Sequence, residues 1–135
     1  MASVFTKIIN GEIPSYKIYE DEHSYALLDI HPLRAGHTLV ISKREVTQFH
    51  ELSEDEFANL MRTVHKVGRQ IDKVLAPKRV VEMAHSYGVE HVHIHLVPTN
   101  SYEEFRQAVI DHEHIDMGVE PDHKALAEMH KKLSF

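Results

Sequence analysis

The most regular pattern in the chain is an apolar stripe with helical spacing between residues 53 and 76. Ser53 and Glu56 form an S-x-x-E capping box that predicts the start of a helix, and Pro77 predicts its end. The stripe runs at steps of mostly three and four residues, which is typical of a helix with one buried face. Its members are Phe57, Leu60, Met61, Val64, Val67, Ile71, Val74 and Leu75.

Shorter segments alternate or run apolar in the manner of strands. We predict strands at residues 16–20, 24–30, 37–42, 78–84 and 91–98, separated by polar turns or by the long helix. Val4, Phe5, Ile8 and Ile9 predict a short helix that stops at Asn10, a further helix begins near residue 101, and a last one covers 120–133. Most successive strands lack long crossovers. The sequence therefore predicts a single α+β domain over residues 1–135, with a five-stranded antiparallel sheet and helices on one face.

Composition narrows the functional classes. The 135 residues carry 15 Lys and Arg against 21 Asp and Glu, a net charge of −6, so we expect no nucleic-acid partner. Cysteine is absent, which excludes disulfides and thiolate chemistry. No signal peptide or apolar run long enough for a membrane span is found, and the expected location is the cytoplasm, with no membrane partner.

Histidine is the unusual residue type, with 13 copies, and three of them fall in the segment HVHIHLVP. In a strand, His91, His93 and His95 would share one face, about 6.6 Å apart from one to the next. A solvated face, a metal site built on imidazoles and a site for chemistry on an anion are the three interpretations of this row. Burying three imidazoles without hydrogen-bond partners is costly, so the row indicates a functional role.

The triplet is similar to the His-φ-His-φ-His-φ-φ signature of the histidine triad family, φ being apolar. Upstream, FTKIINGEIPSYKIYEDEHSYALLDIHPLRAGHTLVISKR resembles the amino-terminal half of that family, with its motifs in the expected order. The resemblance covers residues 4–98, the core of the expected domain, and leaves 99–135 as a variable tail. It points to the branch typified by purine nucleoside phosphoramidases.

The resemblance implies a catalytic role for four histidines. His93 would attack the α-phosphorus of a nucleoside phosphoramidate and form a nucleotidyl-histidine intermediate, which water then hydrolyses. The carbonyl of His91 would orient His93, His95 would contact phosphate oxygens, and His37 would be the fourth histidine of the site. The resemblance calls for no cofactor. Dinucleoside polyphosphate hydrolysis, or regulatory nucleotide binding with negligible turnover, are the alternative functions.

The resemblance also implies a site for the nucleoside. Asp29 would accept hydrogen bonds from the ribose hydroxyls, with capping of a turn as the alternative role. The purine would lie in an apolar slot formed by Phe5, Ile8, Ile13, Leu28 and Ile30. The loop before the triad would add Gly88 and Val89 to the substrate-binding residues. For each apolar member, a place in the hydrophobic core is an equally good interpretation.

Three departures from the family pattern stand out. Ser3, Thr6 and Glu45 replace three ligands of a structural zinc found in many relatives, so we expect no metal. Gly88 replaces a hydroxyl residue near the leaving group. The loop before the triad is short, which would bring the carboxylate of Glu82 near the phosphate, with His85 and Tyr87 as substitute donors. The tail segment 111–116 (DHEHID) is interpreted as a solvated acidic turn.

The family pattern further implies a homodimer. The helix predicted at 53–76 and the strand predicted at 78–84 would form the shared face, on which Val80, Val81 and Met83 add to the apolar stripe of the helix.

Overall fold

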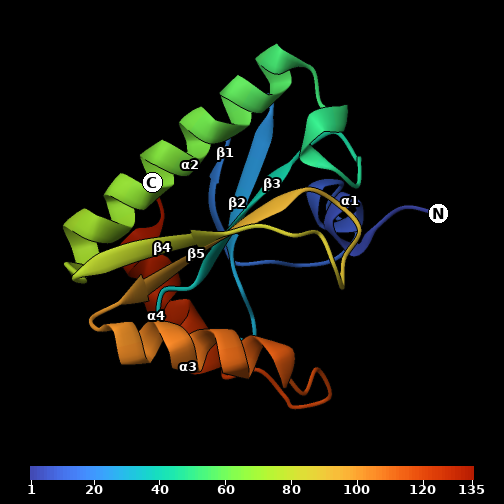
Figure 1. Cartoon of the computed structure of the whole chain (residues 1–135). Helices are drawn as coiled ribbons and strands as arrows, with labels where there is room; N and C mark the ends of the chain where they lie inside the picture. The colour runs from blue at the N-terminus through green and yellow to red at the C-terminus, as the bar shows by residue number, and fades with distance from the viewer.

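The computed structural model describes all 135 residues, and its centre is a five-stranded antiparallel sheet (Figure 1). Its order is β1-β2-β3-β5-β4, so β1 and β4 are the edge strands. The sheet predicted from the sequence is confirmed, with ends that differ by one to two residues. The strands are β1 (Lys17–Glu20), β2 (Ser24–Leu28), β3 (Thr38–Ser42), β4 (Arg79–Met83) and β5 (His93–Thr99).

Helix α2 (Glu54–Leu75) covers one face of the sheet. Ser53 and Glu56 form the predicted capping box, and the chain leaves the helix at Ala76, whose φ of 48° is left-handed. The buried stripe of α2 packs on alternate residues of the strands, among them Ala26, Val40 and Ile94, in the main hydrophobic core. Leu126 and Leu133 of α4 (His123–Leu133) join the same core, so part of the C-terminal tail packs against this face.

The opposite face of the sheet is also covered by helices, and here the sequence prediction of helices on one face was wrong. Phe5 of α1 (Val4–Ile9) packs on Leu27 and Ile41, and Ala108 of α3 (Tyr102–Glu113) packs on Val97. In Figure 1 the sheet lies between α2 above and α3 below. Both faces of the sheet are covered, since all five residues of β2 and of β3 are buried.

Strand register decides which residues share the face of α1 and α3. His93 pairs with Ile41, and His95 pairs with Leu39. Side chains of paired residues point to the same side of a sheet, so both histidines face α1 and α3 rather than α2. His91 lies two residues before β5 begins, although its side chain is fully buried. None of the helices combines the length and apolar character needed to cross a lipid bilayer.

Candidate functional site

His93 is held in one tautomer by the backbone. It occupies the first position of β5 and is 4% exposed, and its Nδ1 lies 2.6 Å from the carbonyl oxygen of His91. A carbonyl oxygen can only accept, so Nδ1 carries the proton and donates it. The other ring nitrogen, Nε2, therefore keeps its lone pair, as a nucleophile requires.

His37 and His95 form a second chain of hydrogen bonds that also begins at the backbone. The N–H of Leu33 donates to Nδ1 of His37 over 3.1 Å, so the proton of neutral His37 is on Nε2. That nitrogen lies 3.0 Å from Nδ1 of His95 and donates to it. The proton of His95 is then on Nε2, which is buried and has no partner. The structure therefore presents an N–H donor beside the lone pair of His93, with ring centroids 4.9 Å apart.

Gly36 allows the backbone just before His37 to pass close to Leu75 of α2. Gly36 has a φ of 94°, and a Cβ added there would lie 2.5 Å from Cδ1 of Leu75. Only glycine fits such a backbone at such a close approach, and the turn delivers His37 to the start of β3.

Burial keeps the imidazoles neutral. Desolvation lowers the pKa of His37 to about 3 and that of His95 to about 2, with neighbouring histidines adding to the shift. Desolvation also lowers the pKa of His93, against a smaller opposing effect of its hydrogen bond to His91. Near neutral pH the site thus contains one ring lone pair and one free N–H, without a positive charge on these rings.

Three residues of the expected purine slot lie close together. The Phe5 ring lies edge-on to His93, with centroids 4.9 Å apart, and Ile8 and Val89 pack against the cluster that contains Phe5. The prediction that Leu28 belongs to the slot was wrong, because its side chain lies in the core under α2, on the other face of the sheet. Ile30 is 40% exposed.

The two remaining residues of the expected slot are Ile13 and Gly88. Ile13 is partly exposed, outside the clusters of buried apolar residues. Gly88 belongs to the loop that precedes the triad and has a φ of 82°, in the left-handed region that favours glycine.

Asp29 has one oxygen engaged in a turn and the other near the histidines. Its Oδ1 accepts the N–H of His31 over 2.8 Å, which is the turn-capping role. Its Oδ2 lies 3.6 Å from Nε2 of His37. Burial raises the pKa of the carboxyl group, with the His31 contacts opposing. Capping of the turn therefore leaves a second oxygen available to a ligand.

The four positions that match a zinc site in relatives do lie together, but they bond to one another. Oγ of Ser3 donates to Nδ1 of His91 over 2.6 Å, and Nε2 of His91 donates to the carbonyl of Ser42 over 2.6 Å. Glu45 accepts from the N–H of Ser3 over 2.8 Å and from the hydroxyl of Thr6. Neutral hydroxyls are poor zinc ligands. In this protein the connection between the start of α1 and His91 is the hydrogen bond from Ser3.

Glu82 does not face the histidines, contrary to the concern raised by the sequence. It pairs with Leu96, whereas its neighbour Met83 pairs with His95. Because side chains alternate along a strand, Glu82 lies on the face opposite to His95. A carboxylate beside the phosphate position is thereby avoided.

One residue of the site was missed in the sequence. His112, in the segment interpreted as a solvated turn, lies in the last turn of α3, with its ring centroid 5.1 Å from that of His95. His85 contacts both, since its Nε2 is 2.9 Å from Nε2 of His112 and its ring stacks on His95 at 5.8 Å. No local pattern connects residue 112 to residue 95, so only the packing of α3 reveals the contact.

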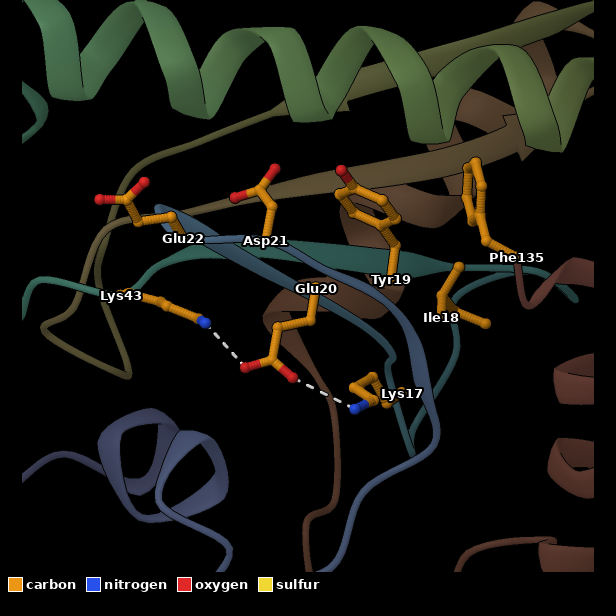
Figure 2. Close-up of a pocket in the computed structure, with 8 residues that line it drawn as sticks. All are labelled: Lys17, Ile18, Tyr19, Glu20, Asp21, Glu22, Lys43 and Phe135. Atoms are coloured by element: carbon orange, nitrogen blue, oxygen red, sulfur yellow. Dashed lines mark hydrogen bonds and ion pairs between the residues drawn. The ribbon is translucent and has the colours of Figure 1, made fainter.

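A separate hollow lies along β1 and contains no histidine (Figure 2). Glu20 there accepts from Lys43 over 2.7 Å and from Lys17 over 3.1 Å, and the two ammonium groups lower the pKa of its carboxyl group. Both lysines of the hollow are thus paired with Glu20, and no histidine or free cation faces it.

Comparison with known proteins supports the family resemblance of the histidine row. Residues 10–102 match the HIT domain. The chain belongs to the HIT family. Among HIT proteins it is 40% identical over 99 residues to a HIT-like protein of Methanocaldococcus jannaschii, covering 70% of this chain and 77% of that protein. It is 37% identical over 105 residues to the adenosine 5'-monophosphoramidase of Schizosaccharomyces pombe, covering 76% and 78%.

Solved HIT structures share the fold over nearly the whole chain. A HIT-like protein of Bartonella henselae, described as involved in cell-cycle regulation, has a TM-score of 0.77 at 26% identity, covering 97% of this chain and 93% of the other. The matched HIT domain ends at residue 102 and thus includes His37, His85 and the triad but excludes His112.

Proposed function

We propose that this HIT protein hydrolyses purine nucleoside phosphoramidates, or related nucleoside 5′-phosphate conjugates, at the α-phosphorus through a nucleotidyl-His93 intermediate. The observation that carries the proposal is the 2.6 Å hydrogen bond from Nδ1 of His93 to the carbonyl of His91, which leaves Nε2 as a free nucleophile. Family membership and the similarity to an adenosine 5'-monophosphoramidase support a nucleotide hydrolase.

In the first step Nε2 of His93 forms a bond to the α-phosphorus, and the bond from phosphorus to the leaving nitrogen breaks. The leaving amine takes up a proton from solvent as it departs. In the second step water attacks the phosphorus and releases a proton to solvent, the bond to Nε2 breaks, and the nucleoside monophosphate leaves with His93 again neutral. The free N–H of His95 is suited to stabilise the charge on the phosphoryl oxygens in both steps.

The nucleoside end of the substrate would lie towards α1. Phe5, Ile8 and Val89 provide apolar surface beside His93, and Oδ2 of Asp29 accepts from the ribose hydroxyls. Binding and chemistry therefore depend on different groups, which makes them separable by mutation.

A nucleotide-binding protein with negligible turnover is the second candidate, and Gly88 is the observation that favours it. Gly88 has no side chain to help the leaving group, so the first step depends on other donors.

The test is a panel of adenosine phosphoramidate, lysyl-adenylate and diadenosine tetraphosphate, assayed with wild-type protein and with His93→Ala and His93→Asn. We expect turnover of the phosphoramidate, a nucleotidyl adduct in acid-quenched wild-type protein by intact mass, and neither in the variants. AMP affinity should change by less than about tenfold, or ~1.4 kcal/mol. If His93→Ala kept a tenth of wild-type turnover, the covalent mechanism would be wrong. Nucleotide binding without turnover of any substrate would favour the second candidate.

A further inference from the structure

His85 and His112 form a third chain of hydrogen bonds that begins at the backbone. The N–H of Tyr87 donates to Nδ1 of His85 over 2.9 Å, so the proton of neutral His85 is on Nε2. This Nε2 lies 2.9 Å from Nε2 of His112 and donates to it. The proton of His112 is then on Nδ1, which is buried and has no partner.

The two rings that end such chains, those of His95 and His112, lie close together. The chain from Leu33 ends at the unpartnered Nε2–H of His95, and the chain from Tyr87 ends at the unpartnered Nδ1–H of His112. The ring centroids of His95 and His112 are 5.1 Å apart, and that of His93 is 4.9 Å from that of His95. A buried N–H without an acceptor is unfavourable, and an anionic oxygen that accepts from both N–H groups would relieve both.

We propose that His112 is a further substrate-binding residue, whose Nδ1–H, positioned by His85, donates to a phosphate oxygen beside the donor of His95. The proposal rests on the proposed function, since it assigns a role in binding the phosphate of the same nucleotide. It gives the tail of this chain a part in the site, which would offset the hydroxyl group absent at Gly88. His112 lies outside residues 10–102, which match the HIT domain, and belongs to α3.

A metal ion is the obvious rival for this cluster. Nitrogens of His85, His95 and His112 all lie within 4.8 Å of one another, a separation that suits a transition-metal ion. Coordination through Nε2 would move the proton of His85 to Nδ1, where it would face the N–H of Tyr87. For His95 the displaced proton would face Nε2–H of His37 in the same way. Two contacts between donors would result, so the hydrogen-bond chains favour an anion over a cation.

The binding test compares AMP with adenosine, which lacks the phosphate, by titration calorimetry. His112→Ala should weaken AMP binding about tenfold and leave adenosine binding within about twofold, because only the phosphate contact is lost. His112→Asn should keep most of the AMP affinity, since its amide nitrogen replaces Nδ1 as a donor. The matched control is His114→Ala, an exposed histidine two residues further on, which should behave as wild type with both ligands.

Ring ¹⁵N shifts of wild-type protein give an independent test that requires no variant. We expect the proton of His112 on Nδ1 and that of His95 on Nε2, and both shifts should move when AMP is added. A proton on Nε2 of His112 would overturn the assignment. So would AMP affinity that is equal in His112→Ala and His114→Ala, or stoichiometric Zn²⁺ bound by wild type and lost in His112→Ala.

These outcomes separate this inference from the proposed function. If the wild type binds AMP but turns over no substrate, the proposed reaction is wrong while the role of His112 in binding stands or falls on its own measurement. If turnover is normal and His112→Ala binds AMP like the wild type, only the assignment of His112 is wrong.

Discussion

Replacing Ser3 with alanine tests whether hydrogen bonds take the place of a metal at α1. The hydroxyl of Ser3 accepts the N–H of Thr6 over 3.1 Å as the helix cap and donates to Nδ1 of His91 over 2.6 Å. Loss of a cap costs about 1 kcal/mol. His91 is fully buried, so an unsatisfied Nδ1 adds about 1–3 kcal/mol. We therefore expect Ser3→Ala to lower the free energy of unfolding by about 2–4 kcal/mol, out of roughly 5–15 kcal/mol for a typical domain.

The matched control is Ser101→Ala. Ser101 caps α3 by accepting the N–H of Glu104 over 3.1 Å and has no histidine contact, so its replacement should cost only about 1 kcal/mol. Urea denaturation of the three proteins, with and without a chelator, measures both differences. Equal destabilisation by the two substitutions would refute the contribution of the bond to His91. A chelator that lowered the stability of the wild type would show that a metal stabilises α1 after all.

Three further predictions concern acid sensitivity, ribose recognition and assembly. The pKa of His93 lies below its usual 6.5, so the acid limb of kcat/KM should lie below pH 6.5, and an acid limb at or above 6.5 would contradict this. Stability should decrease as the pH drops below 6.5, because the unfolded chain binds more protons there than the folded protein does. Asp29→Asn keeps the acceptor for the His31 turn but loses the charge, so adenosine affinity should drop roughly ten- to a hundredfold by calorimetry, and unchanged affinity would remove Asp29 from the ribose site. Edge strand β4 and the neighbouring α2 should form a homodimer with twice the 15.6 kDa of the chain by light scattering, and a monomer mass at micromolar concentration would exclude it.

The elements of the fold were predictable because each has a local signal. The capping box at Ser53 and the apolar stripe behind it locate α2 to within one residue at each end. The second layer of helices was missed, although the sequence contained a clue. Leu27, Leu39 and Ile41 are apolar on the face that carries the histidines, and an apolar second face needs a cover.

The site shows the same division between local and distant information. The row of three histidines is visible in the spacing, and the contact that sets the tautomer of His93, implied by the family resemblance, joins residues only two positions apart. The placement of Leu28 depends on which face of β2 it occupies, and a resemblance that assigns residues to a slot does not state which way each side chain points. His112 depends on how α3 packs, 17 residues after His95 in the chain, and nothing in its own segment distinguishes it from a solvated histidine.

What makes the cluster a catalytic candidate is that three of its proton positions are fixed by the backbone. The carbonyl of His91 fixes the proton of His93, and the N–H groups of Leu33 and Tyr87 fix those of the other two chains. The consequence is one lone pair beside two N–H donors, although all the groups are imidazoles. A neutral donor is desolvated at less cost than a cation, so these buried rings can meet a phosphate without first taking up protons. Under the proposed function, identical side chains would thus take opposite roles, nucleophile and donor, set by the main-chain group at which each chain of hydrogen bonds begins.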